Sequence, residues 1–181
     1  MLDDLRYIPH VNGTARGAWP TLFLDYDGPL HPDEVYLIKG KIVLKADGVA
    51  LFEYAPLLEQ ALAPFPQVKL VLATSWVKAL GFDQAKAYLP AGLQTRVTGA
   101  TYHSKMPREW WSSMTRYEQI AAYVREHGVQ RWLALDNDDE GWPETLRNRL
   151  VHVDDWLGVF EARAQQELQT KLEALVAPLR P

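Results

Sequence analysis

Short apolar runs alternate with longer segments of mixed polarity along most of this chain of 181 residues. The runs are almost continuously hydrophobic, which is typical of strands in a parallel sheet that is covered on both faces. This pattern predicts strands at Thr21–Leu24, Val68–Ala73, Trp132–Leu135 and Leu150–Val153, with a weaker fifth at Arg96–Thr98.

The segments between these runs carry apolar residues at the three- and four-residue spacing of amphipathic helices. We predict helices at Ala50–Leu62, Val77–Leu89, Tyr117–Glu126 and Val159–Leu175. Because strand alternates with helix, the fold class expected is α/β, a doubly wound, Rossmann-like architecture with a mainly parallel sheet.

One insertion interrupts the alternation. Val35–Ile38 and Lys41–Leu44, joined around Lys39-Gly40, have the pattern of a β-hairpin. Ligands of such folds bind outside the carboxyl ends of the strands, so a hairpin near 35–45 is expected to project over the site as a minimal cap. Residues 1–20 show no sustained period and are interpreted as an N-terminal leader, with 21–181 as a single domain.

The stretch from His103 to Thr115 is the most irregular part of the chain and contains the adjacent Trp110 and Trp111. Two interpretations are open: a surface loop whose aromatic side chains pack back on the body, or a platform for substrate. Since tryptophan is generally well buried, the first is favoured.

The amino-acid composition excludes several types of metal site and catalytic nucleophile. The chain has no cysteine, which excludes thiolate zinc sites, cysteine nucleophiles and iron–sulfur clusters but leaves oxygen-ligated metals open. No apolar run approaches the roughly 18 residues that a membrane-spanning helix needs. We expect a cytoplasmic protein with no membrane partner.

The net charge of −4 is unevenly distributed. Residues 25–34 and 136–140 together hold eight acidic residues and no lysine or arginine, so the remainder of the chain is net positive. Each acidic segment directly follows a predicted strand. Like charges at the ends of two buried strands are unfavourable unless a cation neutralises them, which predicts a metal site.

Asp25-Tyr26-Asp27-Gly28-Pro29-Leu30 is the strongest single signal. Asp25 and Asp27 leave the strand on the same side, and Gly28 permits a sharp turn that brings backbone close to a ligand. This arrangement suits a divalent cation shared with a phosphate, one carboxylate attacking and the other moving a proton. The alternative is that Asp and Gly simply end a strand.

This segment resembles the signature loop of the haloacid dehalogenase (HAD) superfamily, Asp-x-Asp-Gly-Thr/Val-Leu, with Pro29 where Thr or Val is usual. The resemblance implies a three-layer α/β/α sandwich. It also implies that Asp25 is a nucleophile forming an aspartyl phosphate, that Asp27 is the general acid/base, and that both hold Mg²⁺. Gly28 would lie against the substrate.

The resemblance implies three further motifs. Thr74 would hold the phosphoryl group, with Ser75 contributing through its backbone or as a substitute. Asp136 and Asn137 would complete the magnesium site, with Asp138 and Asp139 as alternates. A cation near the start of the helix before the last acidic strand would offset the phosphate charge, and Arg116 is favoured over Lys105 for this role.

More narrowly, the chain resembles the HAD domain associated with composite bacterial RNA-repair proteins. The matching segments are Asp25–Pro32, Pro56–Leu58, Thr74–Trp76, Pro90–Leu93 and Arg96–Gly99. This resemblance suggests a phosphate end on a nucleic acid as substrate. Composition gives limited support, because the pI is about 5.7 and no basic tract is present.

The leading prediction is a magnesium-dependent phosphomonoesterase acting on a phosphorylated substrate. A HAD dehalogenase or phosphotransferase is an alternative, although the presence of Asp27 and of the cluster at Asp136 argues against a dehalogenase. A catalytically weak phosphate-binding module is another alternative. His31, His103 and His152 are not assigned to a metal, and His31 is interpreted as a turn residue with a satisfied ring that could touch substrate.

Overall fold

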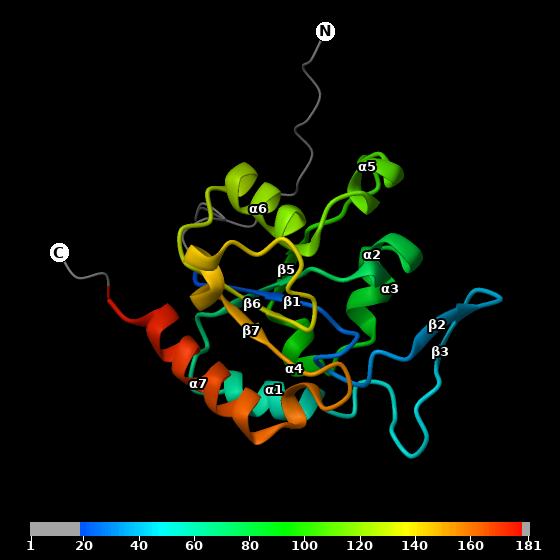
Figure 1. The fold of residues 1–181 in the computed structure, drawn as a ribbon, viewed down its shortest axis with the longest axis horizontal. Helices are drawn as coiled ribbons and strands as arrows, with labels where there is room; N and C mark the ends of the chain where they lie inside the picture. The colour runs from blue at the N-terminus through cyan, green and yellow to red at the C-terminus, as the bar shows by residue number, and fades with distance from the viewer. Residues whose placement is uncertain (1–18, 179–181) are drawn as a thin grey trace, which may run out of the picture.

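A parallel sheet forms the centre of the computed structural model, which describes residues 19–178 (Figure 1). Its strand order is β5-β4-β1-β6-β7. The strands are β1 (Thr21–Leu24), β4 (Lys69–Leu72), β5 (Val97–Ala100), β6 (Trp132–Asp136) and β7 (Leu150–His152). All five predicted strands are therefore present, with ends that differ by at most two residues. The predicted leader lies outside the described residues, apart from Trp19 and Pro20.

Register brings the carboxyl ends of the central strands together. Strand β1 lies between β4 and β6 and pairs in parallel with both, so that Leu24 is level with Leu72 and with Leu135. The residues that follow these positions leave the sheet at one edge. The two acidic segments and the Thr74 segment consequently meet there, as expected for a doubly wound sheet.

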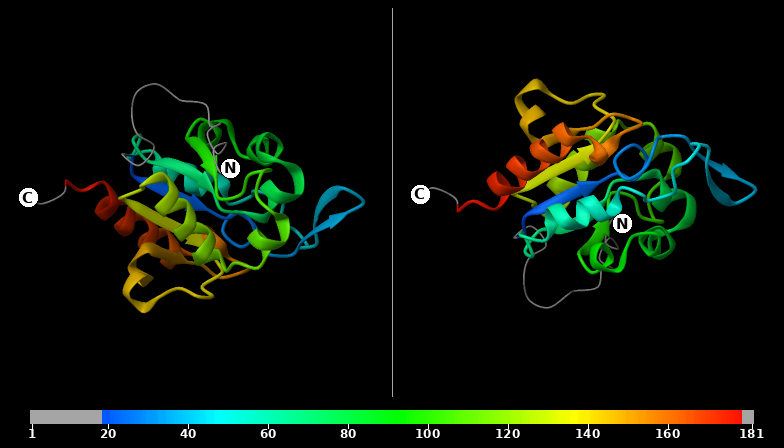
Figure 2. Two further views of the ribbon diagram at one scale, coloured as in Figure 1. Left: turned by 90° about the horizontal axis from the view of Figure 1, so that it is seen from above. Right: turned by 90° about the horizontal axis from the view of Figure 1, so that it is seen from below.

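Alternation along the strands sends side chains to two separate layers. Leu22 and Leu24 pack in one hydrophobic cluster with α1 (Ala55–Leu62) and α7 (Ala162–Val176), whereas Phe23 packs in a second cluster with α6 (Arg116–His127). Figure 2 shows α6 on one face of the sheet and α1 and α7 on the other. The predicted three-layer α/β/α sandwich is confirmed.

The remaining helices are short. They are α2 (Ser75–Leu80), α3 (Phe82–Ala87), α4 (Ala91–Gln94), α5 (Arg108–Ser112) and the 3₁₀ helices η2 (Glu144–Arg149) and η3 (Gly158–Phe160). None of the helices within residues 19–178 is long and apolar enough to cross a membrane.

Three helix predictions were wrong in their bounds, for local reasons. The helix expected from Ala50 begins at Ala55, because Phe52 has a positive φ of 61° and Pro56 falls in the first turn. The single helix expected at Val77–Leu89 is two helices separated by Gly81. The helix expected from Val159 starts at Ala162, after the turn of η3.

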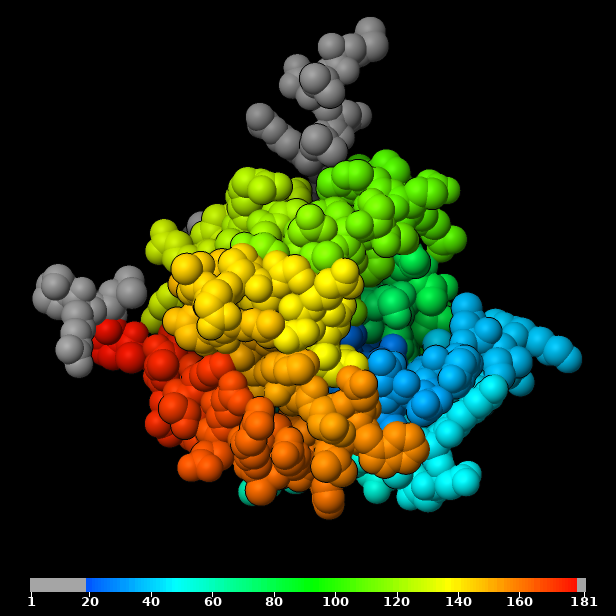
Figure 3. Space-filling model, viewed as in Figure 1, coloured from blue at the N-terminus to red at the C-terminus, as the bar shows by residue number. Residues whose placement is uncertain are grey.

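The predicted hairpin is present as β2 (Val35–Ile38) and β3 (Lys41–Leu44), which pair antiparallel around Lys39 and Gly40. It follows the β1 loop directly and projects away from the body (Figures 1 and 3). The irregular stretch after β5 contains α5, where Trp111 is buried and Trp110 is 51% exposed. Only one of the two tryptophans therefore packs back on the body.

Candidate active site

Four polar residues meet at the carboxyl edge of β1, β4 and β6. Asp25 follows β1, Thr74 follows β4, and Asp136 ends β6; each is buried. The fourth, Arg116, begins α6 and reaches across from the helix layer. In Figure 3 the segment after β1, in blue, is visible between the yellow segment after β6, the orange segment after β7 and the hairpin.

Arg116 joins the two buried carboxylates. Its Nη2 lies 2.9 Å from Asp25 Oδ2, and its Nε lies 2.9 Å from Asp136 Oδ2. Its Nη1 donates to the Gln119 side chain at 3.0 Å. Gln119 is one turn further along the helix and is itself buried, donating to the carbonyls of Trp111 and Met114. The guanidinium is therefore held in one orientation.

The position of Arg116 follows from how α6 starts. Thr115 caps the helix: its hydroxyl accepts a hydrogen bond from the N–H of Glu118, and the Glu118 carboxylate accepts one from the N–H of Thr115. This capping box fixes the first turn of the helix. Arg116 is the first residue after the cap, so the cap sets the place from which its side chain extends.

The Asp25 carboxylate has a partner on each oxygen. Oδ1 accepts the N–H of Tyr26 at 2.8 Å, and Oδ2 accepts from Arg116. The Thr74 hydroxyl also hydrogen-bonds this carboxylate, and Thr74 caps α2 by accepting from the N–H of Trp76. A carboxylate held in this way presents its free lone pairs in a fixed direction.

Burial leaves this part of the protein with unbalanced negative charge. Burial, opposed by Arg116 and reinforced by the charge of Asp27, raises the pKa of Asp25 from 3.8 to about 6. Burial likewise raises the pKa of Asp136 well above its usual value, again opposed by Arg116. One guanidinium does not fully compensate two buried carboxylates with a third nearby.

The Asp27 carboxylate accepts hydrogen bonds from a different set of donors. The indole N–H of Trp76 is 2.9 Å from Asp27 Oδ1 and 3.0 Å from Oδ2, and Nε2 of His31 is 3.1 Å from Oδ1. Trp76 and His31 are buried, while the Asp27 side chain is 19% exposed. His31 is indeed a satisfied turn residue, as expected, but its ring is satisfied by a predicted catalytic carboxylate.

Gly28 is required by a close approach. Its φ is +85°, and a Cβ built there would lie 2.4 Å from Cγ of Asn137. Gly158 after β7 is equally constrained, because a Cβ there would lie 2.3 Å from the carbonyl oxygen of Gly28. The loop after β1 therefore packs directly against two neighbours at the site. These are the Asn137 side chain after β6 and the backbone of the loop after β7.

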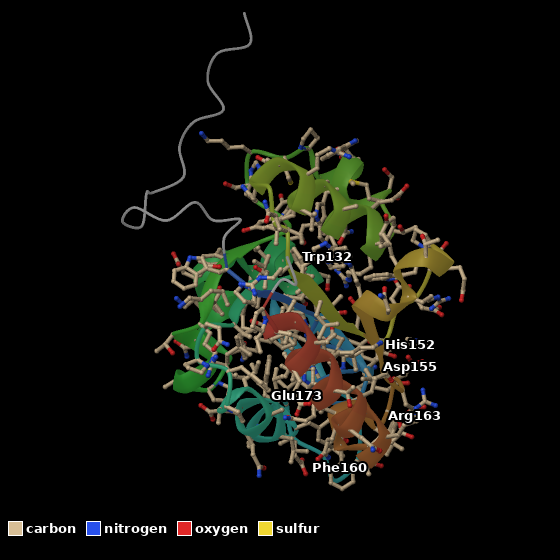
Figure 4. All side chains as sticks on the ribbon, turned by 90° about the vertical axis from the view of Figure 1, so that its left-hand side faces the viewer. Trp132, His152, Asp155, Phe160, Arg163 and Glu173 are labelled. Carbon is tan, nitrogen blue, oxygen red and sulfur yellow. The ribbon has the colours of Figure 1, made fainter. Side chains whose placement is uncertain are left out.

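Asn137 connects these loops. Its Nδ2 donates to Asp155 Oδ1 at 2.9 Å and to Asp33 Oδ2 at 3.2 Å, and its carbonyl oxygen lies 2.9 Å from Nε2 of His152. Figure 4 labels His152 and Asp155 on this flank, after β7. Burial and the charge of Asp27 raise the pKa of Asp33.

Not all predicted site residues come together. Within residues 19–178, only Arg116 forms ion pairs with Asp25 and Asp136, whereas Lys105 is exposed in the segment before α5. Ser75 is exposed at the start of α2. The Asp136 carboxylate accepts a hydrogen bond from the N–H of Asp138 on Oδ1, whereas its Oδ2 forms an ion pair with Arg116 Nε but has no hydrogen-bond partner among the described residues.

Sequence reasoning missed the contribution of Trp76 and of the loop at 154–160. Trp76 is 49 residues from Asp27 in the chain, and no local pattern connects the two. The available signal was the place of Trp76 two residues after Thr74, on the first turn of a helix that starts at the sheet edge. For His31, the available signal is its spacing of four residues from Asp27.

The donors present fit magnesium in a particular way. No group of three or more His, Asp or Glu side chains within residues 19–178 is arranged to hold a metal ion by itself. Mg²⁺ commonly uses one or two carboxylates together with water and substrate phosphate. Asp25 and the Oδ1 of Asn137, which faces Gly28, supply such oxygens beside uncompensated negative charge.

Comparison with known proteins identifies one family. A family model described as "HAD domain in Swiss Army Knife RNA repair proteins" matches residues 21–164. None of the curated proteins and none of the solved structures matches the chain. The matched range covers every side chain of the site and ends within α7.

Proposed function

Because this chain belongs to the family of HAD domains found in Swiss Army Knife RNA repair proteins, which makes it a HAD-type hydrolase, we propose that it is a magnesium-dependent phosphomonoesterase. Asp25 is the nucleophile and Asp27 the general acid/base in this proposal. The single observation that carries it is the state of Asp25: a buried carboxylate, oriented by Arg116, Tyr26 N–H and the Thr74 hydroxyl, beside a second carboxylate.

The proposed reaction has two steps. In the first, an Asp25 oxygen attacks phosphorus, the bond from phosphorus to the leaving oxygen breaks, and protonated Asp27 gives its proton to that oxygen. In the second, Asp27 takes a proton from a water molecule whose oxygen attacks phosphorus. The bond from Asp25 to phosphorus then breaks, and inorganic phosphate leaves with Asp25 and Asp27 restored.

Each remaining site residue has a role in this scheme. Arg116 offsets the negative charge of Asp25 and of the phosphoryl group, and Asp136 orients Arg116. The Thr74 hydroxyl and the backbone at Ser75 and Gly28 contact the phosphoryl oxygens. Mg²⁺ would be held by Asp25, Asp27 and Asn137. When bound, the ion neutralises negative charge on the phosphoryl group being transferred.

The substrate class is a terminal phosphate on RNA. The family description names RNA repair, and the hairpin that follows the β1 loop projects outward from the body (Figure 1). Residues 35–45 include Lys39, Lys41 and Lys45 and no acidic residue. Cations at this position favour a polyanion that extends beyond the phosphate being removed.

The test is an assay of phosphate release from an aryl phosphate and from a phosphate-terminated RNA oligonucleotide, with Mg²⁺ and with a chelator. The proposal expects release that requires Mg²⁺ and is lost in Asp25→Asn. Phosphate or oligonucleotide binding without release would instead assign the chain to the alternative, a HAD-fold phosphate-binding module.

A further inference from the structure

His31 and Trp76 form a buried pair of donors beneath the β1 loop. The side chain of His31 is fully buried and that of Trp76 is 2% exposed. Both direct an N–H toward the same carboxylate, that of Asp27. Neither residue has a role in the scheme above. Burying an N–H donor costs free energy unless its hydrogen bond is kept, so both residues depend on a fixed position of the Asp27 carboxylate.

The proton on His31 is assigned by its other nitrogen. The backbone N–H of Phe52 donates to Nδ1 of His31 at 3.3 Å, so in the neutral ring the proton lies on Nε2 and faces Asp27. Phe52 adopts a φ of +61°, which is costly for a bulky residue. A strained backbone position thus makes the hydrogen bond that sets the tautomer of His31.

Aromatic packing holds both donors in place. The Phe52 ring lies 5.3 Å from that of Trp76 and 5.0 Å from that of His31, and Tyr26 packs edge-on against Trp76 at 5.5 Å. Tyr26 is itself the residue between the two catalytic aspartates. The donors therefore have little freedom to turn away from Asp27.

We infer that His31 and Trp76 are positioning residues that hold the carboxyl of Asp27 at the leaving-group oxygen. This inference rests on the proposed function. The indole N–H reaches both oxygens of Asp27 and His31 shares Oδ1, so Oδ2 is the less engaged oxygen and the one that exchanges the proton. A general acid acts only within hydrogen-bond reach of its partner, so loss of orientation weakens protonation.

The inference separates two kinds of substrate. A nitrophenolate leaves without receiving a proton, whereas an alkoxide needs one. The ratio kcat/KM reports events up to departure of the leaving group, so it detects general-acid action independently of the later water step. Weakened positioning should consequently affect alkyl phosphates more than nitrophenyl phosphate.

The experiment measures kcat/KM for both substrates in Trp76→Phe, which removes the N–H, and in His31→Leu. Asp27→Asn gives the split expected when the acid is absent. His31→Gln keeps an N–H donor of similar reach. Trp142→Phe is the matched control, because Trp142 is also buried and its indole N–H has no partner among the described residues.

We expect Trp76→Phe and His31→Leu to lower kcat/KM for the alkyl phosphate about ten-fold more than for nitrophenyl phosphate. His31→Gln should restore most of this loss, and Trp142→Phe should produce no split. Equal losses on both substrates in folded variants, or no loss, would overturn the inference. If Trp76→Phe melts below the assay temperature, the comparison of His31→Gln with His31→Leu decides. A wild-type protein that releases phosphate neither from these two substrates nor from a phosphate-terminated RNA oligonucleotide would refute the proposed function itself.

Discussion

Asp25 has a raised pKa although an arginine lies 2.9 Å away. Unfolded, this carboxyl ionises near 3.8, and in the folded protein near 6. Between these values the folded protein keeps a proton that the unfolded chain has lost. The free energy of unfolding therefore falls as pH rises through this range, and it stays lower above it.

Asp25→Asn removes this penalty. In the presence of a chelator, the free energy of unfolding of the variant should rise relative to that of the wild type as the pH increases from about 4 to about 8. The expected change in this difference is of the order of 3 kcal/mol. Urea unfolding at the two pH values checks this. Mg²⁺ should raise the melting temperature of the wild type more than that of the variant. A stability difference that does not change with pH would show that Asp25 is not buried as described.

Arg116 and Lys105 can be distinguished by their environments. Arg116→Met leaves two buried carboxylates without their partner, so we expect a loss of about 3–5 kcal/mol at neutral pH. The loss should shrink in acid, where both carboxyls are protonated. Lys105→Met changes an exposed side chain and should stay within about 0.5 kcal/mol of the wild type. Denaturant titrations of both variants test this, and similar losses in the two would contradict it.

Residue chemistry explains which parts of the site were predictable. Asp25, Thr74 and Asp136 each follow an apolar strand, and parallel strands deliver such residues to one edge. Trp76 and His31 act on Asp27 through side-chain packing that depends on Phe52, whose strained backbone has no sequence signature. The choice of Arg116 over Lys105 as the predicted cation agrees with the geometry, but its catalytic role remains a prediction.

Among the elements, α6 connects the helix layer to the site. Its capping box precedes Arg116 immediately. Thr115→Ala should cost about 1 kcal/mol of stability through the lost cap. Thr170→Ala is a suitable control, since Thr170 is exposed within α7 and alanine is the better helix former. Thermal or urea unfolding measures both, and equal effects would mean that the cap contributes nothing specific.

Strands were easier to predict than helices in this chain. A buried parallel strand is a short apolar run with few alternatives, so all five were located. Helix ends depend on single backbone conformations: φ of +61° at Phe52 delays α1, and Gly81 divides the helix expected after Thr74. Periodicity detects the apolar face and does not detect these interruptions.

For the whole molecule, the proposed function predicts that a long substrate would contact the hairpin formed by β2 and β3. The N–H of Lys45 bonds the carbonyl of Glu34 at 2.8 Å, so the two ends of the hairpin are adjacent. Residues 35–44 can therefore be replaced by a two-residue turn. We expect this change to raise KM for a phosphate-terminated oligonucleotide more than for an aryl phosphate, which is too small to reach the hairpin. Steady-state kinetics measure both, and equal changes would assign the hairpin a structural role only.

The central claim is that Asp25 carries the phosphoryl group during turnover. Asp27→Asn should slow the water step, so rapid acid quenching of this variant with a nitrophenyl phosphate should trap the intermediate. Mass spectrometry of the digested protein is predicted to find one phosphoryl group on the peptide that contains Asp25, absent when Asp25 is also replaced by Asn. Release of nitrophenol with no phosphoryl group on that peptide, or with the group on another residue, would contradict the account.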